Sequence, residues 1–344
     1  MPKNMRAAFA REPGRVVVEE IAVPEPAPDE VLLQIRRCGI CGSDLHWYHG
    51  GIPLPHVCPG HEISAVVADV GSAVRRVKPG DRVAVEGIRT CGRCAYCETS
   101  DYELCRNVGM IGMTVPGGFA EYLATTERHL FAIPGSVDDE VAQLTEPLAV
   151  SVHALRLAGL EMGQRVLVLG AGTIGLTAVA AARAGGAGEI LVTARRPQQK
   201  AAALALGAAR VFDPNDGELV STCFDRPVDV VVETVGDAQQ TLGDAVTCVR
   251  PGGTIAILGV FMQMPQLNAL FVMMKEARIV GSLCYGRRGA RADFDVALDI
   301  LARDGEAMRR QMITHRFALD DIDAAFRAAN DKASGSIKVS IAPA

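Results

Sequence analysis

The chain has 344 residues, of which 49% are hydrophobic and 22% are charged, and its formal net charge is −5. Such a length favours two domains, and such a composition excludes an intrinsically disordered chain. The charges form no basic stripe, which argues against a nucleic-acid surface.

No targeting or membrane-spanning segment is expected. Residues 1–6 lack the apolar core of a signal peptide. The longest run of low polarity, residues 166–182, is too short to cross a bilayer. We therefore expect a cytoplasmic protein with no membrane partner. In that reducing compartment, clustered cysteines are expected to bind metal rather than to form disulfides.

Alternating β-branched residues and turns dominate residues 1–150. Residues 31–35, 63–70 and 82–86 have the pattern of strands, and residues 78–81 have that of a tight turn. This pattern predicts a mostly antiparallel, barrel-like domain.

Candidate ligands of one metal ion are scattered through this domain. Cys41 lies in the motif Cys-Gly-Ile-Cys-Gly-Ser-Asp, His61 and Glu62 follow a glycine, and Glu146 precedes a proline. A catalytic zinc ion typically has three protein ligands of these types and one open position. Each residue also has a structural alternative, as a small core thiol, a hydrogen-bonding imidazole or a helix-start acid. The prediction therefore depends on the combination.

Four further cysteines, Cys91, Cys94, Cys97 and Cys105, are clustered in a short segment. A single Cys-x-x-Cys pair would leave redox or disulfide chemistry open. Three cysteines at three-residue steps, followed by a fourth, fit one closed tetrahedral zinc site better. We expect a structural zinc lobe over residues 88–108, with no coordination position left for a substrate.

The pattern changes at residue 151, where short apolar strands alternate with alanine-rich helical stretches. This alternation predicts an α/β domain with a doubly wound parallel sheet, of the Rossmann type, over residues 151–287. The expected strands are 166–169, 189–192, 228–232 and 254–258.

A glycine loop follows the first of these strands and opens a helix. It consists of Gly170, Gly172 and Gly175, with Thr173 and Ile174 between the last two. In this context the first glycine makes the turn, the second lets the backbone approach a pyrophosphate, and the third allows close packing. The motif alone could be a structural turn, but its flanking strand and helix favour dinucleotide binding.

The end of the next strand bears on the choice between NAD and NADP. Where an acidic residue would bind the ribose 2′-hydroxyl, the chain has Ala194, followed by Arg195 and Arg196. Two guanidinium groups without the carboxylate favour the 2′-phosphate of NADP. The alternative is a solvated basic loop in which Pro197 starts a helix.

The tail contains an expected helix, 294–302, and a final strand, 336–341. From about residue 288 we expect it to return to the first domain. The predicted domains are therefore 1–150 with 288–344, and 151–287.

These motifs together resemble the zinc-dependent medium-chain dehydrogenase/reductases, which include sorbitol, butanediol, threonine and secondary-alcohol dehydrogenases. The resemblance runs nearly end to end. Two positions depart from it. Ala65 replaces a common glycine, and Cys284 is found where sorbitol-type members usually have an arginine nearby, which puts a sorbitol assignment in doubt. The shared segments are 38–44, 59–62, 79–83, the cysteine lobe, 117–122, 146–149, the glycine loop and 281–282.

The resemblance implies a GroES-like catalytic domain with a catalytic zinc near Cys41, His61, Glu62 and Glu146. The two acids can exchange roles in such enzymes, and which one binds zinc directly is left open. Ser43 and His46 match the proton relay of the family. Trp47 and Tyr48 are expected to line the pocket.

The resemblance also predicts which residues lie near the nicotinamide half of the cofactor and how the chains assemble. Backbone around Val235, Leu258 and Val260 would flank the nicotinamide. A homodimer or homotetramer is implied, with the strand at 254–258 and its following loop as a contact.

The expected function is hydride transfer between NAD(P), with NADP favoured, and a small secondary alcohol, diol or polyol, with two zinc ions per chain. One alternative is a non-catalytic NAD(P)-binding protein of the same fold. Another is an NAD-dependent threonine-type dehydrogenase. A zinc-free quinone or enoyl reductase would lack the set of Cys41, His61 and Glu62.

Overall fold

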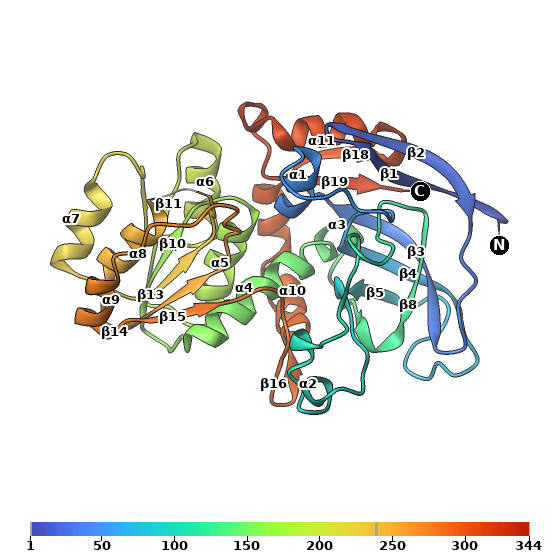
Figure 1. Cartoon of the computed structure of the whole chain (residues 1–344), viewed down its shortest axis with the longest axis horizontal. Helices are drawn as coiled ribbons and strands as arrows, with labels where there is room; N and C mark the ends of the chain where they lie inside the picture. Colours follow the sequence, from blue (N-terminus) through green and yellow to red (C-terminus); the bar gives the residue numbers. More distant parts are fainter. Residues whose placement is uncertain (1, 238–239, 344) are drawn as a thin grey trace. The chain divides into compact units, whose positions relative to one another are not determined.

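The computed structural model describes residues 2–237 and 240–343. The chain divides into two compact units: the first contains Met1–Glu146 and Gly286–Ala344, and the second contains Pro147–Tyr285 (Figure 1). Each unit has its own sheet and its own buried core. Within the described ranges, no helix is both long enough and apolar enough to span a membrane.

A seven-stranded sheet forms the framework of the first unit. Strand β3 pairs with β4, β8 and β19, and β4 continues through β5 to the edge strand β9. These pairs are antiparallel, whereas β18 and β19 are parallel. The strands are β3 (Glu30–Gly39), β4 (Glu62–Val70), β5 (Arg82–Val85), β8 (Tyr122–Thr126), β9 (Leu130–Ala132), β18 (Ile313–Ala318) and β19 (Lys338–Ala342).

The expected antiparallel domain is present, but its strands do not close into a barrel in the part of the chain that the structure describes. Their hydrogen-bonded order runs from β18 to β9 without returning to its start. Helix α11 (Ile322–Asn330) contacts both β18 and β19. A helix therefore packs at this end of the sheet, where a closed barrel would need a further strand.

Smaller elements complete the first unit. Strands β6 and β7 form a short ladder that brings the two ends of the predicted zinc lobe together. The remaining elements are β1 (Asn4–Glu12), β2 (Arg15–Ala22), α1 (Gly42–Tyr48), β6 (Ile88–Arg89), α2 (Ala95–Glu98), β7 (Gly109–Met110), α3 (Asp139–Ala142), β16 (Arg287–Arg288), β17 (Arg291–Ala292) and α10 (Asp293–Met312). Helix α4 spans Thr145–Ala158.

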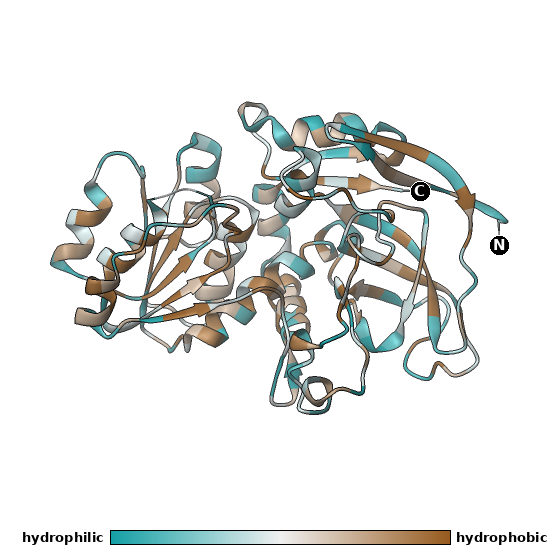
Figure 2. Cartoon of the chain, viewed as in Figure 1, coloured by the Kyte–Doolittle hydropathy of each residue, from teal (hydrophilic) through white to brown (hydrophobic). Residues whose placement is uncertain are grey.

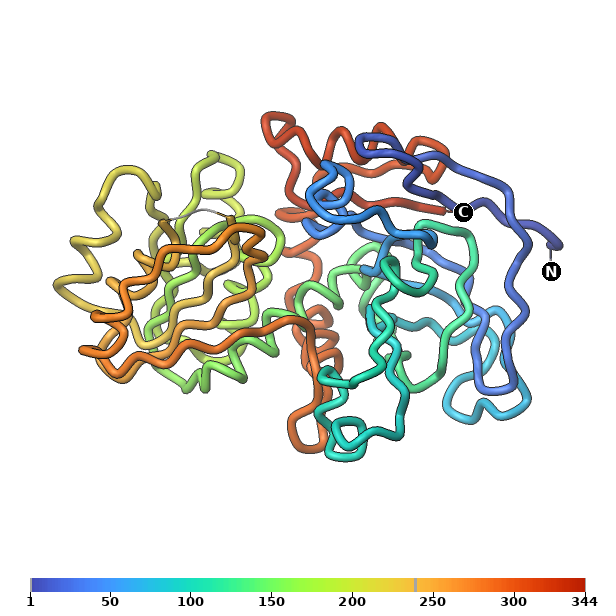
Figure 3. The backbone as a smooth tube through the Cα atoms, viewed as in Figure 1, coloured from blue at the N-terminus to red at the C-terminus, as the bar shows by residue number. Residues whose placement is uncertain are grey.

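The C-terminal segment joins the first unit through its last strand. In β19, Ser340 lies opposite Gly39 and Ile341 opposite Cys38 of β3. Figure 3 shows the red C-terminal segment beside the blue N-terminal part of the chain. A strand from the far end of the sequence therefore lies next to the motif that contains Cys41.

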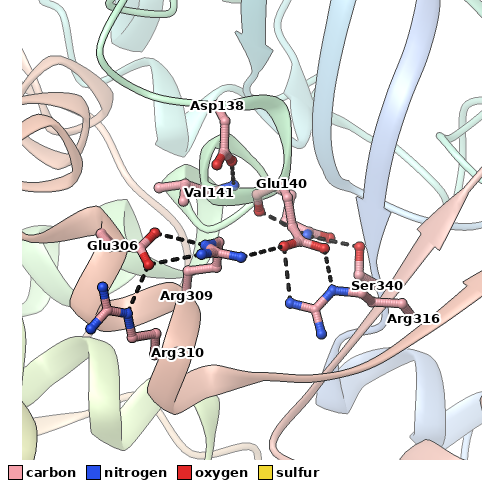
Figure 4. Close-up of polar contacts among 9 residues, drawn as sticks. Asp138, Glu140, Val141, Glu306, Arg309, Arg310, Arg316 and Ser340 are labelled. Atoms are coloured by element: carbon pink, nitrogen blue, oxygen red, sulfur yellow. Dashed lines mark hydrogen bonds and ion pairs between the residues drawn. The ribbon is translucent and has the colours of Figure 1, made fainter.

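Ion pairs also hold this segment to α3. Glu140 accepts hydrogen bonds from Arg316 at 2.6 and 3.0 Å and lies 3.8 Å from Arg309 (Figure 4). Arg309 and Arg310 both donate to Glu306. The network connects α3 with α10 and β18.

The second unit is a six-stranded parallel sheet in the order β12-β11-β10-β13-β14-β15. Every residue of β10 is buried, and the strands are mostly brown, the colour of hydrophobic residues, in Figure 2. The strands are β10 (Arg165–Leu169), β11 (Glu189–Thr193), β12 (Arg210–Phe212), β13 (Val228–Glu233), β14 (Val249–Ile257) and β15 (Arg278–Gly281).

Counted along the chain, this strand order is 3-2-1-4-5-6, the doubly wound order of dinucleotide-binding sheets. The Rossmann prediction is therefore confirmed. In such a sheet, ligands bind at the carboxyl ends of the strands, where the order reverses between strands 1 and 4. The helices are α5 (Thr173–Ala184), α6 (Pro197–Leu206), α7 (Glu218–Asp225), α8 (Thr241–Cys248) and α9 (Ala269–Lys275).

Candidate functional site

The four-cysteine cluster has the geometry of a tetrahedral metal site. Its four sulfur atoms all lie within 4.8 Å of one another. The Sγ–Sγ distances are 3.5 Å for Cys91–Cys105, 3.6 Å for Cys94–Cys97, 3.9 Å for Cys94–Cys105 and 4.0 Å for Cys91–Cys97. Sulfurs ~2.3 Å from one zinc ion at tetrahedral angles would be about 3.8 Å apart. The four thiols therefore fit a closed zinc site.

Backbone N–H groups favour the thiolate form in this cluster. The N–H of Cys91 donates to the sulfur of Cys105 at 3.4 Å. The N–H groups of Cys97 and Arg106 lower the pKa of Cys94 to about 6. Because the thiolate is the form that binds zinc, these donors prepare the cluster for a metal ion.

A buried polar network connects the lobe to the sheet. Glu86 accepts a hydrogen bond from the Tyr102 hydroxyl at 2.6 Å and lies 2.7 Å from Nδ1 of His129. The N–H of Thr90 donates to Nε2 of the same imidazole at 3.2 Å. Since Nε2 accepts, the proton is on Nδ1, facing the carboxylate. Thr90 directly precedes Cys91, so the network holds the first ligand of the lobe.

The structure also brings Cys41 and His61 together. Cys41 is the N-cap residue of α1, and its N–H donates to Asp44 at 2.9 Å. The other oxygen of Asp44 lies 4.0 Å from Nδ1 of His61. Burial lowers the pKa of His61, but Cys41 and Asp44 raise it more, to well above its usual value. Asp44 was not predicted as a site residue, although it ends the motif that contains Cys41.

Glu62 has a partner that the sequence pattern does not indicate. Its carboxylate is 0% exposed and pairs with Nζ of Lys338 at 2.5 Å. Lys338 is 1% exposed and also donates to the carbonyl of Ile40 at 2.8 Å. The sequence signal was a lysine within the short C-terminal strand, where the residues beside it, Ile337 and Val339, are apolar.

Gly39 makes room for this buried acid. It lies opposite Glu62 in the pairing of β3 with β4. A Cβ at residue 39 would be 1.9 Å from Oε2 of Glu62. Any larger residue at this position would displace the carboxylate.

Glu146 is the second buried acid near His61. It is 8% exposed and lies in the first turn of α4. Burial and the charge of Glu62 raise its pKa to about 7, although His61 opposes that shift. Since Glu62 is already paired with Lys338, Glu146 is the acid without such a partner among the described acids of this cluster.

The two relay candidates share one face of α1. Ser43 and His46 are three residues apart in the helix and both are half-buried. Trp47 was expected in the substrate pocket, but it is 0% exposed and packs 5.1 Å from the ring of Phe326. Tyr48 stacks on the same ring, so both aromatic residues belong to the core.

In the second unit, each glycine of the loop has the geometry expected for its role. Gly170 has φ +98, which favours glycine, and follows β10. Gly172 caps α5 and has no atom within 4 Å of the place where a Cβ would be. A Cβ at Gly175 would be 2.0 Å from the carbonyl oxygen of Gly170. Thr173 and Ile174 begin the helix, and the first N–H groups of a helix suit an anion.

The residues after β11 lie at the start of α6. Ala194 is buried, Arg195 is exposed, and Arg196 is the half-buried N-cap residue ahead of Pro197. Among the described residues, neither guanidinium group forms an ion pair. Both are therefore available to an anion.

The three residues expected near the nicotinamide follow β13 and β14. Val235 is 41% exposed and Val260 is 48% exposed. Leu258 donates its N–H to the carbonyl of Glu233 at 2.9 Å. Apolar side chains exposed at the carboxyl edge of a parallel sheet can pack against a flat ring such as the nicotinamide.

Comparisons with known proteins agree with these observations. The family model "Alcohol dehydrogenase GroES-like domain" matches residues 27–135, and "Zinc-binding dehydrogenase" matches residues 173–304. Sorbitol dehydrogenase of Bacillus subtilis (strain 168) is 35% identical, over 100% of this chain and 98% of that protein. An L-threonine 3-dehydrogenase of Mesorhizobium japonicum is 34% identical, over 97% of this chain and 98% of that protein.

A solved structure is similar over the same extent. It is a protein of Sinorhizobium meliloti 1021, assigned as a zinc-binding dehydrogenase and bound to NADP. The sequence identity is 33%, the TM-score is 0.89, and the match covers 99% of this chain and 100% of that one.

Proposed function

The chain belongs to the zinc-dependent medium-chain dehydrogenase family, and we propose that it transfers hydride between NAD(P) and a secondary alcohol, diol or polyol. The observation that carries this proposal is that Cys41 and Glu146, from separate segments of the first unit, both lie close enough to His61 to raise its pKa. Among the described residues, only the four-cysteine cluster has all its ligand atoms within 4.8 Å of one another. The first unit is the catalytic domain, and the second unit is the dinucleotide-binding domain.

Two metal sites are part of the proposal. Cys91, Cys94, Cys97 and Cys105 hold a structural zinc, because their spacing fits one tetrahedral ion. Cys41, His61 and Glu146 hold a catalytic zinc, and Glu62 stays paired with Lys338. A zinc ion with an open position supplies Lewis acidity toward an alcohol or carbonyl oxygen. The need for thiolates also supports a reducing, cytoplasmic location.

The side chains of the first unit have distinct tasks in the proposed reaction. Asp44 holds the N–H of Cys41 and lies beside His61, which orients two ligands at once. Ser43 accepts the hydroxyl proton of the alcohol as it passes its own proton on, and His46, on the same face of α1, releases a proton to solvent. For a carbonyl substrate the same residues deliver the proton.

The second unit binds the cofactor in this proposal. The glycine loop and the N-terminus of α5 bind the pyrophosphate. Arg195 and Arg196 bind the 2′-phosphate of NADP, because Ala194 offers no carboxylate to a ribose hydroxyl. The NADP found in the Sinorhizobium meliloti relative supports this preference.

The substrate class follows from the relatives. Sorbitol and threonine both carry a secondary hydroxyl group, and the dehydrogenases named for them match this chain nearly end to end. The non-catalytic alternative would keep the glycine loop but would not need Cys41, His61 and the relay residues together. A small hydroxylated molecule is therefore the proposed substrate.

The test is a substrate screen with the zinc-loaded protein and either NADP or NAD. Secondary alcohols, diols, polyols and threonine are tried as substrates, and the absorbance of the reduced nicotinamide measures turnover. We expect turnover that is faster with NADP, is lost with a chelator and returns with zinc. Cys41→Ser should abolish turnover and leave the dinucleotide Kd within about twofold. Cys223→Ser, in the second unit, is the control. Full turnover by Cys41→Ser would contradict the ligand assignment.

We further propose a homodimer or homotetramer. The contact expected at 254–258 and its following loop stays a prediction, and β14 offers no free backbone edge to it, because β14 is paired on both sides with β13 and β15. Strand β15 is the edge of the sheet, and α9, which follows β14, has no buried residue. These two elements are the proposed contact.

A further inference from the structure

Glu233 ties two loops of the second unit together. It is the last residue of β13 and is 0% exposed. Its Oε1 accepts hydrogen bonds from the N–H groups of Val235 at 2.9 Å and Gly236 at 3.1 Å. Its backbone carbonyl accepts from Leu258 at 2.9 Å and Gly259 at 3.1 Å. One residue therefore binds four N–H groups, two from each loop.

The two loops are packed too closely for side chains at their contact. Gly236 has φ +76, and a Cβ on it would be 2.2 Å from the carbonyl oxygen of Val260. A Cβ on Gly259 would be 2.3 Å from Oε2 of Glu233. Asp237 adds a further link, because its N–H donates to Val260 and its carboxylate accepts from Met262.

This pair of loops lies beside the glycine loop of the same unit. A Cβ at Gly170 would be 2.6 Å from the side chain of Val235 and 2.9 Å from the hydroxyl of Thr234. In a doubly wound sheet, strands 1 to 3 bind one mononucleotide and strands 4 to 6 bind the other. Since β13 and β14 are strands 4 and 5, the two loops belong to the half of the site that binds the nicotinamide mononucleotide, not the adenosine half.

A carboxylate is a costly residue to bury in this place. Burial raises the pKa of Glu233, and the N–H groups of Val235 and Gly236 only partly oppose the shift. Buried polar groups that carry such a cost are found where they hold a required geometry. The geometry that the carboxylate holds here is the loop of Val235, whose side chain is exposed at the carboxyl edge of the sheet.

We propose that Glu233 is the positioning residue of the nicotinamide half-site. Its side chain holds the loop of Val235 against the loop of Val260, which its backbone carbonyl holds, so the carboxylate fixes one wall of the surface against which the ring rests without touching the cofactor itself. This inference rests on the proposed function and names a residue on which the orientation of the hydride-carrying ring depends.

The test compares two ligands that differ only in the nicotinamide. The Kd values of NADP and of 2′-phospho-ADP-ribose are measured for the full-length, zinc-loaded protein and for Glu233→Ala and Glu233→Gln. We expect Glu233→Ala to weaken NADP binding about tenfold and the fragment by less than about twofold. Glu233→Gln retains one acceptor oxygen, so its NADP affinity should lie between those of the wild type and Glu233→Ala.

Asp229 provides the matched control. It lies in the same strand and accepts hydrogen bonds from Arg165 and Arg250, but from none of the described residues of the two loops. Asp229→Asn should leave the ratio of the two Kd values unchanged. If Glu233→Ala weakens both ligands equally, or neither, the positioning role is overturned and the proposed function stands. If the wild type binds no dinucleotide, both are overturned.

Discussion

At the scale of single residues, the candidate site depends on buried charges with distant partners. Glu62 and Lys338 are 276 residues apart in sequence, yet both are buried and form an ion pair. A buried ion without a partner is unfavourable by several kcal/mol, so each member of the pair requires the other. Asp44 acts locally by comparison, because its partner Cys41 is only three residues away.

Lys338→Met should therefore destabilise the protein. The substitution leaves the carboxylate of Glu62 buried without its cation, so we expect the free energy of unfolding to fall by about 3 kcal/mol at neutral pH. Urea unfolding of the wild type and the variant measures the difference.

The double variant Lys338→Met with Glu62→Gln is the control for that experiment. Because it removes both charges, it should recover part of the lost stability. A single variant as stable as the wild type would mean that Lys338 does not compensate a buried charge.

At the scale of elements, α10 shows how packing extends a helix beyond its local pattern. The sequence predicts a helix over 294–302, whereas α10 runs from Asp293 to Met312. Gly305 would be expected to weaken it. A Cβ at this glycine would be 2.7 Å from the side chain of Val141 in α3, so the glycine allows the two helices to approach closely.

The ion pairs between α3 and β18 should make stability depend on pH. Hydrogen bonds from Arg316, and then its charge, lower the pKa of Glu140 below its usual 4.5. A depressed pKa stabilises the fold fully above 4.5, and the effect is lost as the pH falls through the folded-state value. Since Arg316 is partly exposed, we expect Glu140→Gln to cost only about 1 kcal/mol at pH 7.

Unfolding midpoints of the wild type and Glu140→Gln, measured from neutral to acidic pH, test this expectation. The difference between the two proteins should shrink as the pH falls below 4.5. Glu161→Gln, at an exposed position in the second unit, controls for the loss of any carboxylate. A difference that stays constant with pH would show that Glu140 does not act through its charge.

At the scale of the whole molecule, the second unit leaves an apolar surface uncovered. Helix α9 exposes 45% of Phe271, 66% of Met273 and 67% of Met274, and Met264 before it is 95% exposed. Contiguous exposed apolar residues at a sheet edge are typical of subunit contacts. They support the proposed oligomer.

Phe271→Glu combined with Met273→Glu should therefore separate the subunits. Placing two carboxylates in an apolar contact should weaken association by on the order of 100-fold. Light scattering should give a mass of at least two chains for the wild type and 36.4 kDa for the variant. Met162→Glu, at another exposed methionine, should keep the wild-type mass. A wild-type monomer at all concentrations would contradict the proposal.

The main strands of both units could be predicted from the sequence, and edge elements could not. The apolar runs at 166–169 and 228–232 became β10 and β13, because both faces of a parallel sheet are buried and the whole strand is apolar. Strand β15 was missed, since Arg278–Gly281 is mixed in polarity and is stabilised mainly by pairing with β14.

The sequence by itself determined the family, the four-cysteine lobe and the glycine loop. Their chemistry lies in closely spaced residues, and local backbone geometry brings such residues together. Only the tertiary structure decided that Glu62 is paired with Lys338 and that Glu233 binds the loop of Leu258 and Gly259. Those partners meet through sheet pairing between distant segments, and no local pattern records which distant strand a residue will face.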